Sequence, residues 1–70
     1  MPEIIIHAVE GRSLESKQAL LKDITDAVVR NFGVHPDMVT VTIAEAKAEL
    51  KSKGGIPYSV RPPGQIKIGE

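Results

Sequence analysis

The period of the hydrophobic pattern changes along this chain, and each period predicts a different element. Residues 4–9 are apolar on both faces apart from His7 and rich in β-branched side chains, which is typical of a strand covered on both sides. Between residues 14 and 32, apolar positions recur at steps of three and four, which predicts a helix with one apolar stripe. The stripe comprises Leu20, Ile24, Ala27, Val28 and Phe32. Residues 39–45 alternate strictly, which predicts a second strand.

Residues with special backbone preferences mark the ends of these elements. Gly11 gives the turn after the first strand its freedom, and Ser13 is a good N-cap for the helix, with Glu15 in its first turn. Gly33 predicts a left-handed C-cap. Charged positions of the helix are expected to face solvent: Lys17, Lys22, Asp23, Asp26 and Arg30. A strand, a long helix and a second strand predict a βαβ unit with parallel strands.

The remainder of the chain carries weaker signals. Residues 46–53 are compatible with a helical turn or a mobile loop, and Gly54 and Gly55 interrupt them. Residues 56–60 predict a short edge strand, because Pro57 excludes a central one. Residues 61–64 predict a turn or linker, and residues 65–68 a strand that pairs with a neighbouring subunit. The fold class is therefore α/β, as one domain over residues 1–70 with a short C-terminal hairpin or strand.

Composition narrows the possible partners. A chain of 70 residues with no cysteine, one phenylalanine and one tyrosine has little to stabilise it alone, so we expect a homo-oligomer. The nine basic and nine acidic residues cancel, which argues against nucleic acid or an anionic membrane as partner. No apolar run is long enough to span a bilayer and no basic leader is present, so we expect a soluble, cytoplasmic protein. His7 and His35 are too few to predict a metal site.

Candidate chemistry lies at the two ends of the first strand. If Met1 is removed, the Pro2 nitrogen becomes a secondary amine whose pKa an apolar pocket and a nearby cation would lower, as suits a general base near neutral pH. Arg12 follows the strand and offers a planar fork for a substrate carboxylate. From Pro2 to Val9 is seven steps of about 3.3 Å, roughly 23 Å, so an Arg12 that cooperates with Pro2 must come from another subunit. The alternatives are a stiff strand start for Pro2 and a surface charge for Arg12.

The pattern of Met1-Pro2, an isoleucine-rich strand, Glu10-Gly11-Arg12-Ser13, a long helix and a Val-Thr-Val-Thr-Ile strand resembles the 4-oxalocrotonate tautomerase family from Pro2 to about Gly55. The resemblance implies a small βαβ chain assembled as a hexamer, or trimer of dimers. It also implies Pro2 as general base, Arg12 of a neighbouring subunit as carboxylate ligand and catalytic group, and Val9 as a contact to the substrate. The implied reaction is proton transfer in a small carboxylated enol or dienol such as 2-hydroxymuconate, without a cofactor.

Two positions depart from the pattern of that family. Its second active-site arginine falls at Thr40, and a pocket-wall aromatic falls near Lys51. Lys51, Lys53 or Arg61 are alternative sources of the missing charge. Losing one placed electrostatic donor commonly lowers the rate by about two to three orders of magnitude, so we expect weak activity on 2-hydroxymuconate or a different substrate. A silent assembly or small-ligand-binding protein is the alternative from another class, and hydration with dehalogenation, or decarboxylation, are alternatives within the superfamily.

Overall fold

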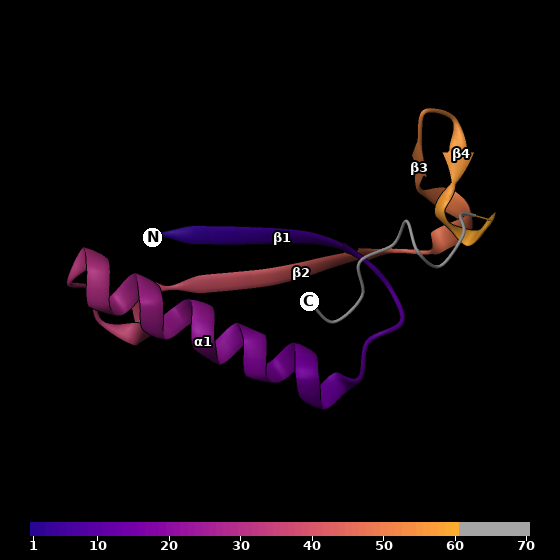
Figure 1. The fold of residues 1–70 in the computed structure, drawn as a ribbon. Helices are drawn as coiled ribbons and strands as arrows, with labels where there is room; N and C mark the ends of the chain where they lie inside the picture. Colours follow the sequence, from indigo (N-terminus) through magenta and orange to yellow (C-terminus); the bar gives the residue numbers. More distant parts are fainter. Residues whose placement is uncertain (61–70) are drawn as a thin grey trace.

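The computed structural model describes residues 1–60, which form a βαβ unit followed by a small hairpin (Figure 1). Strand β1 (Glu3–Val9) and strand β2 (Thr40–Ala46) pair in parallel, in a register that runs from Glu3 opposite Thr40 to Val9 opposite Ala46. Helix α1 (Leu14–Phe32) runs back between them along one face of the two-stranded sheet (Figure 1). The predicted topology is confirmed, with β2 shifted by one residue toward the C-terminus.

Both ends of α1 are capped as the sequence predicts. The Ser13 hydroxyl accepts the backbone N–H of Ser16 at 3.1 Å, and Glu15 lies in the first turn. At the other end, Gly33 is left-handed with φ 69°, and its N–H donates to the carbonyl of Val29. These bonds satisfy backbone groups that a helix end leaves without an intrahelical partner.

The side of α1 that faces the sheet differs in part from the expected stripe. Ile24, Ala27 and Val28 are half-buried as predicted, but Leu20 is 39% exposed and Phe32 68% exposed. Leu21 and Thr25 are half-buried as well. Successive helical residues differ by about 100°, so only one of the neighbouring leucines can point at the sheet. Thr25 tolerates this position because its hydroxyl donates to the Leu21 carbonyl at 2.8 Å.

Lys17 corrects a second expectation. Instead of facing solvent, its ammonium reaches β2 and contacts both carboxylate oxygens of Glu45, at 3.0 and 3.2 Å. The two side chains retain 24% and 27% of their exposure. Glu45 has the same parity along β2 as Val41 and Ile43, on the side that α1 covers. An ion pair therefore joins the first turns of the helix to the end of the second strand.

The opposite face of the sheet has no cover within the described chain. Glu3, Ile5 and His7 of β1 are exposed there, Ile5 at 54%, and so are Thr40 and Thr42 of β2. No residue among 1–60 is fully buried. Residues 1–60 thus do not provide the first strand with the cover on both faces that its apolar pattern predicts, because α1 has only one apolar side to offer.

Beyond β2, the chain forms short elements. A 3₁₀ turn at Ala48–Leu50 leads into β3 (Ser52–Lys53), which pairs antiparallel with β4 (Ile56–Pro57). Gly54 and Gly55 connect them with φ of 63° and 83°, values that favour glycine. The expected strand over residues 56–60 ends at Pro57, and Tyr58–Val60 is a 3₁₀ turn instead. The turn and strand expected at 61–64 and 65–68 lie outside the described residues.

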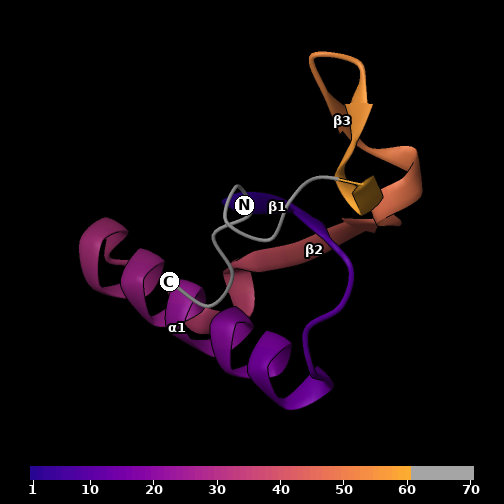
Figure 2. The same ribbon diagram turned by 45° about the vertical axis from the view of Figure 1, so that its right-hand side comes forward.

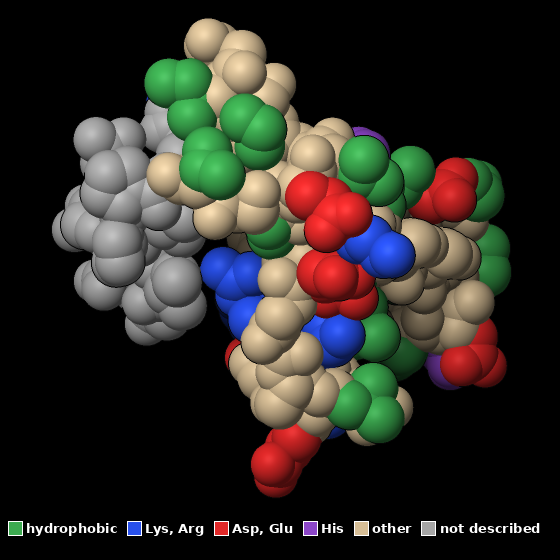
Figure 3. All heavy atoms as spheres, turned by 90° about the vertical axis from the view of Figure 1, so that its right-hand side faces the viewer, with side chains coloured by type: hydrophobic (Ala, Val, Ile, Leu, Met, Phe, Trp, Pro, Cys, Tyr) green, Lys and Arg blue, Asp and Glu red, His purple; other side chains and the backbone are tan. Residues whose placement is uncertain are grey.

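The hairpin projects from the end of the sheet that is remote from the N-terminus (Figures 1 and 2). Hydrophobic side chains gather on its surface (Figure 3). Exposed apolar residues of this region are Leu50, Ile56 and Val60. Within residues 1–60, no helix has the length and apolar character that crossing a bilayer requires.

Candidate active site

Pro2 lies at the entrance of β1, where the two strands begin side by side. Its carbonyl accepts the N–H of Thr40 at 3.1 Å, which fixes the residue to the start of β2. Pro2 is half-buried, whereas Met1 before it is 77% exposed. Pro2 is therefore attached to the sheet through its carbonyl, and the residue before it extends into solvent.

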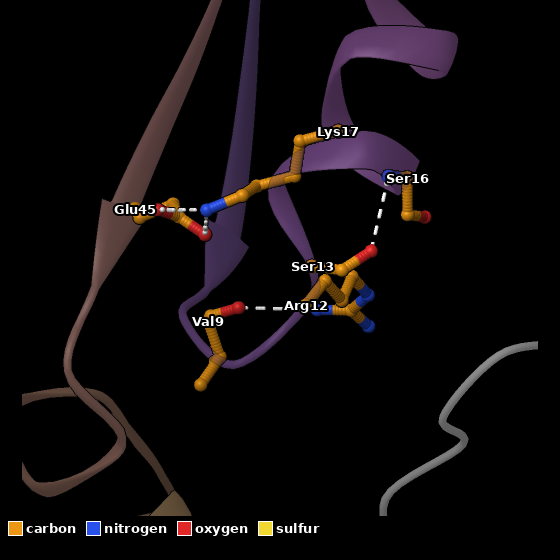
Figure 4. Close-up of polar contacts among 6 residues, drawn as sticks. All are labelled: Val9, Arg12, Ser13, Ser16, Lys17 and Glu45. Carbon is orange, nitrogen blue, oxygen red and sulfur yellow. Dashed lines mark hydrogen bonds and ion pairs between the residues drawn. The ribbon is translucent and has the colours of Figure 1, made fainter.

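Arg12 lies beyond the other end of β1, in the connection to α1. Gly11, with φ 130°, turns the chain there, a conformation that L side chains rarely adopt. The Arg12 Nη1 donates to the carbonyl of Val9 at 3.1 Å (Figure 4). This bond is the only one Arg12 makes to the described part of the chain, and the side chain is exposed. A guanidinium has five N–H donors, so most of its fork remains available to a ligand.

The two candidate catalytic residues are at opposite ends of the first strand. The seven residues of β1 separate them, about 23 Å at 3.3 Å per residue. Figure 1 shows the N-terminus at one end of the sheet and the turn into α1 at the other. The chain folds without bringing its own Arg12 to its own Pro2, in agreement with the estimate made from strand length.

The other candidate residues divide between these two ends. Thr40 is exposed at the Pro2 end, opposite Glu3 in the register. Val9 is half-buried at the Arg12 end. Lys51 follows the 3₁₀ turn before β3 and is half-buried, and its carbonyl accepts the N–H of Tyr58 at 2.7 Å. Lys53 is exposed on β3, and Arg61 lies outside the described residues.

Two groups at these ends are not among the residues predicted from the sequence. Glu3 is exposed and directly follows Pro2, so the signal that could have identified it was its position next to Pro2 in the sequence. The contact between Lys17 and Glu45 lies close to the turn that carries Arg12 (Figure 4). Its signal was Glu45 itself, a charged residue on the face of the second strand that otherwise presents Val41 and Ile43.

Metal ligands are not grouped in the described part of the chain. Residues 1–60 contain no set of three His, Cys, Asp or Glu side chains arranged to hold an ion.

Solved structures of other proteins share this fold. A 4-oxalocrotonate tautomerase isozyme from Methylibium petroleiphilum superposes with a TM-score of 0.78 at 38% identity, covering 83% of this chain and 91% of that one. A 4-oxalocrotonate tautomerase from Chloroflexus aurantiacus, described as a heterohexamer, superposes with a TM-score of 0.79 at 30% identity, covering 86% and 97%. The architecture is the tautomerase fold.

Sequence comparison gives the family. The family model described as "Tautomerase enzyme" matches residues 2–50. A relative from Bradyrhizobium diazoefficiens, named as a probable tautomerase, is 47% identical over 61 residues, which cover 87% of this chain and 91% of the relative. A probable tautomerase from Ralstonia nicotianae is 36% identical over 69 residues, covering 96% and 99%. The chain belongs to the tautomerase family, a family of isomerase-type enzymes, which confirms the resemblance seen in its sequence.

Proposed function

We propose that this chain is a tautomerase that moves a proton within a small carboxylated enol or dienol, with the Pro2 amine as general base. Family membership supports the reaction class. The half-buried Pro2 at the start of β1, behind an exposed Met1, supports the choice of base. Removing Met1 converts an amide nitrogen, which has no basicity, into a secondary amine that can accept a proton.

The proposed reaction needs nothing beyond proton transfer. The neutral Pro2 amine removes a proton from the substrate, and the resulting ammonium returns it to a different atom of the conjugated system. Charge that develops on the carbonyl oxygen or enolate between the two steps is stabilised by positive groups near it. No electron is gained or lost, so the reaction requires no redox cofactor.

The observation that carries the proposal furthest is the separation of Pro2 and Arg12 along β1. For both to contact one substrate, Arg12 must come from a neighbouring subunit, and the site then lies across a subunit interface. The uncovered face of the sheet, with Ile5 at 54% exposure, is consistent with such an assembly. We propose a homo-oligomer, as a hexamer, which is the stoichiometry of the related Chloroflexus protein, although that protein has more than one kind of chain.

Substrate choice depends on the residues around these two. Arg12 binds the carboxylate, and Val9, whose carbonyl holds the guanidinium, lies beside it. Thr40 offers a neutral hydroxyl where an arginine would offer charge, and Lys51 brings a cation near the hairpin instead of an aromatic wall. We therefore propose slow turnover of 2-hydroxymuconate relative to a substrate with a single carboxylate.

The neutral Thr40 also favours a second function. Without the positive charge of an arginine at this position, the chain is a candidate for a catalytically silent assembly that binds small carboxylates through Arg12. The two functions differ in whether Pro2 changes the rate of a reaction.

Kinetics on the processed protein test the proposal. Mass spectrometry first establishes that Met1 is absent. With phenylpyruvate or 2-hydroxymuconate as substrate, Pro2→Ala should lower kcat, and Arg12→Ala should mainly raise KM, because a ligand of the carboxylate contributes to substrate binding. The rate should rise with pH through an ascending limb near neutrality, as the amine loses its proton. Rates that are unchanged in both variants would rule out the enzyme and leave the binding protein.

A further inference from the structure

Glu3 places a carboxylate next to the nitrogen on which the proposed reaction depends. It is the first residue of β1 and pairs in register with Thr40, whose N–H holds the Pro2 carbonyl at 3.1 Å. The backbone on both sides of the Pro2–Glu3 peptide is therefore fixed. The Glu3 side chain is exposed on the uncovered face of the sheet, and within residues 1–60 it has no hydrogen bond or ion pair.

The other charged groups at this end of the molecule are distant from Pro2 in the sequence, and two of them contact each other. The elements that meet there are β1, β2, the 3₁₀ turn at Pro36–Met38 and the last turn of α1 (Figure 1). They carry Arg30, His35 and Asp37. His35 Nδ1 accepts the N–H of Asp37 at 3.1 Å and lies 3.9 Å from its carboxylate. Arg30 is exposed on the helix, and Thr40 is neutral. Glu3 is thus the charge that the covalent chain itself places beside Pro2.

We propose that Glu3 sets the charge around the Pro2 nitrogen, so that the site holds the protonated amine more firmly and disfavours a second anionic group on the substrate. This inference rests on the proposed function. It assigns to Glu3 a positioning role through the amine, not contact with the reacting atoms. It also gives a reason, besides the neutral Thr40, for a preference for substrates that carry one carboxylate.

Simple electrostatics gives the size of the effect. Adjacent residues in an extended chain place the Glu3 carboxylate roughly 5–8 Å from the Pro2 nitrogen. At that distance, and with the high effective dielectric constant of a site that substrate and solvent enter, Coulomb attraction corresponds to a rise of about 0.3–1 unit in the pKa of the amine. The Debye length at physiological ionic strength is about 8 Å, so salt weakens this effect without abolishing it.

The test compares Glu3→Gln with Asp23→Asn in processed protein. Asp23 is an exposed carboxylate in the middle of α1, so its variant has the same change in net charge on the helix and not on β1. The first readout is titration of the Pro2 amine by NMR after labelling proline with ¹⁵N. The second is the pH profile of kcat/KM for phenylpyruvate, with one carboxylate, and for 2-hydroxymuconate, with two.

We expect Glu3→Gln to lower the pKa of the amine and to move the ascending limb to lower pH by about 0.3–1 unit, with a smaller shift in 1 M salt. The ratio of kcat/KM for the dianion to that for the monoanion should rise about two- to fivefold. Asp23→Asn should change neither quantity.

The possible outcomes distinguish a failure of the role proposed for Glu3 from a failure of the proposed tautomerase function. An unmoved amine titration in Glu3→Gln overturns the role of Glu3 while leaving Pro2 as base. Equal losses of activity at every pH, with the ascending limb in place, indicate a structural role and overturn it too. If the amine titration shifts but the wild-type chain has no tautomerase activity, the proposed function fails and the charge-setting role of Glu3 stands.

Discussion

At the scale of single residues, Ser13 does two things at once. It closes the N-terminus of α1 by accepting the N–H of Ser16 at 3.1 Å, and it follows directly after Arg12. The cap therefore fixes where the helix begins and how many residues remain for the turn that carries the guanidinium. Sequence reasoning identifies this residue reliably, because the preference of serine for an N-cap is a local property of the chain.

Ser13→Ala should destabilise the protein by about 1 kcal/mol, because one orphan N–H of the first turn loses its acceptor. Ser16→Ala is the matched control: it removes the same hydroxyl three residues later, where only the backbone N–H takes part in the cap. Urea unfolding at one fixed protein concentration measures both, since assembly makes the midpoint concentration-dependent. Equal effects of the two variants would contradict the capping assignment.

At the scale of elements, two lysines of one helix have different surroundings. Lys17 and Glu45 join α1 to β2 and are each about one-quarter exposed, at 24% and 27%. Lys22 and Asp26 lie four residues apart on the outer surface of α1, 2.7 Å from each other and more than half exposed. The first contact joins two residues that are 28 positions apart in sequence, whereas the second joins two residues of the same helix. Ion pairs stabilise a fold measurably only where solvent screens them poorly.

Lys17→Met should therefore destabilise the protein by about 0.5–1 kcal/mol, because Glu45 is left half-buried without its partner. The same change at Lys22 should leave the unfolding midpoint where it is. A double variant, Lys17→Met with Glu45→Gln, should recover part of the loss, because no unpaired carboxylate remains. Identical midpoints for the two single variants would show that the contact to β2 contributes no more than the surface pair.

The pH dependence of the outer pair follows from the same geometry. The hydrogen bond that the Lys22 ammonium donates to the Asp26 carboxylate, and then the negative charge of Asp26, raise the pKa of Lys22 above its usual value. Whatever stability this pair contributes is complete below that usual value and is lost as the pH rises through the raised one. Stability near neutral pH is therefore insensitive to it.

At the scale of the whole molecule, residues 1–60 leave both the sheet and the proposed active site incomplete. One helix covers one face of the sheet, and the other face leaves Ile5 and two threonines in solvent. The proposed active site is divided in the same way, with Pro2 at one end of β1 and Arg12 at the other. Assembly would resolve both problems together.

Mixing two impaired variants, assayed at a substrate concentration well below the KM of Arg12→Ala, tests whether the site is shared. If Arg12 acts on the Pro2 of a neighbouring subunit, co-refolding equal amounts of Pro2→Ala and Arg12→Ala should restore about a quarter of the wild-type sites, because some hybrid interfaces contain both native residues. Each variant refolded alone is the control. No recovery on co-refolding, in assemblies shown by native mass spectrometry to be mixed, would contradict a site built across subunits.

Local chemistry in the sequence determined the two strands, the capped helix, the parallel βαβ order and the positions of Pro2 and Arg12. Caps, glycine turns and hydrophobic period depend on residues a few positions apart, so they can be read from the chain itself. The length of the first strand was enough to separate Pro2 from Arg12, because the rise per residue of a strand is nearly constant.

Only the tertiary structure decided which side of α1 faces the sheet and what the charged residues do there. Leu20 and Leu21 are equivalent by hydrophobicity, and the choice between them depends on how the helix is rotated against β1 and β2. Lys17 and Glu45 meet across 28 residues, a contact that no local pattern specifies. The proposed effect of Glu3 on Pro2 likewise depends on the register with Thr40, which fixes that end of the sheet. Local rules give the elements, whereas packing fixes their faces and the neighbours of each charge.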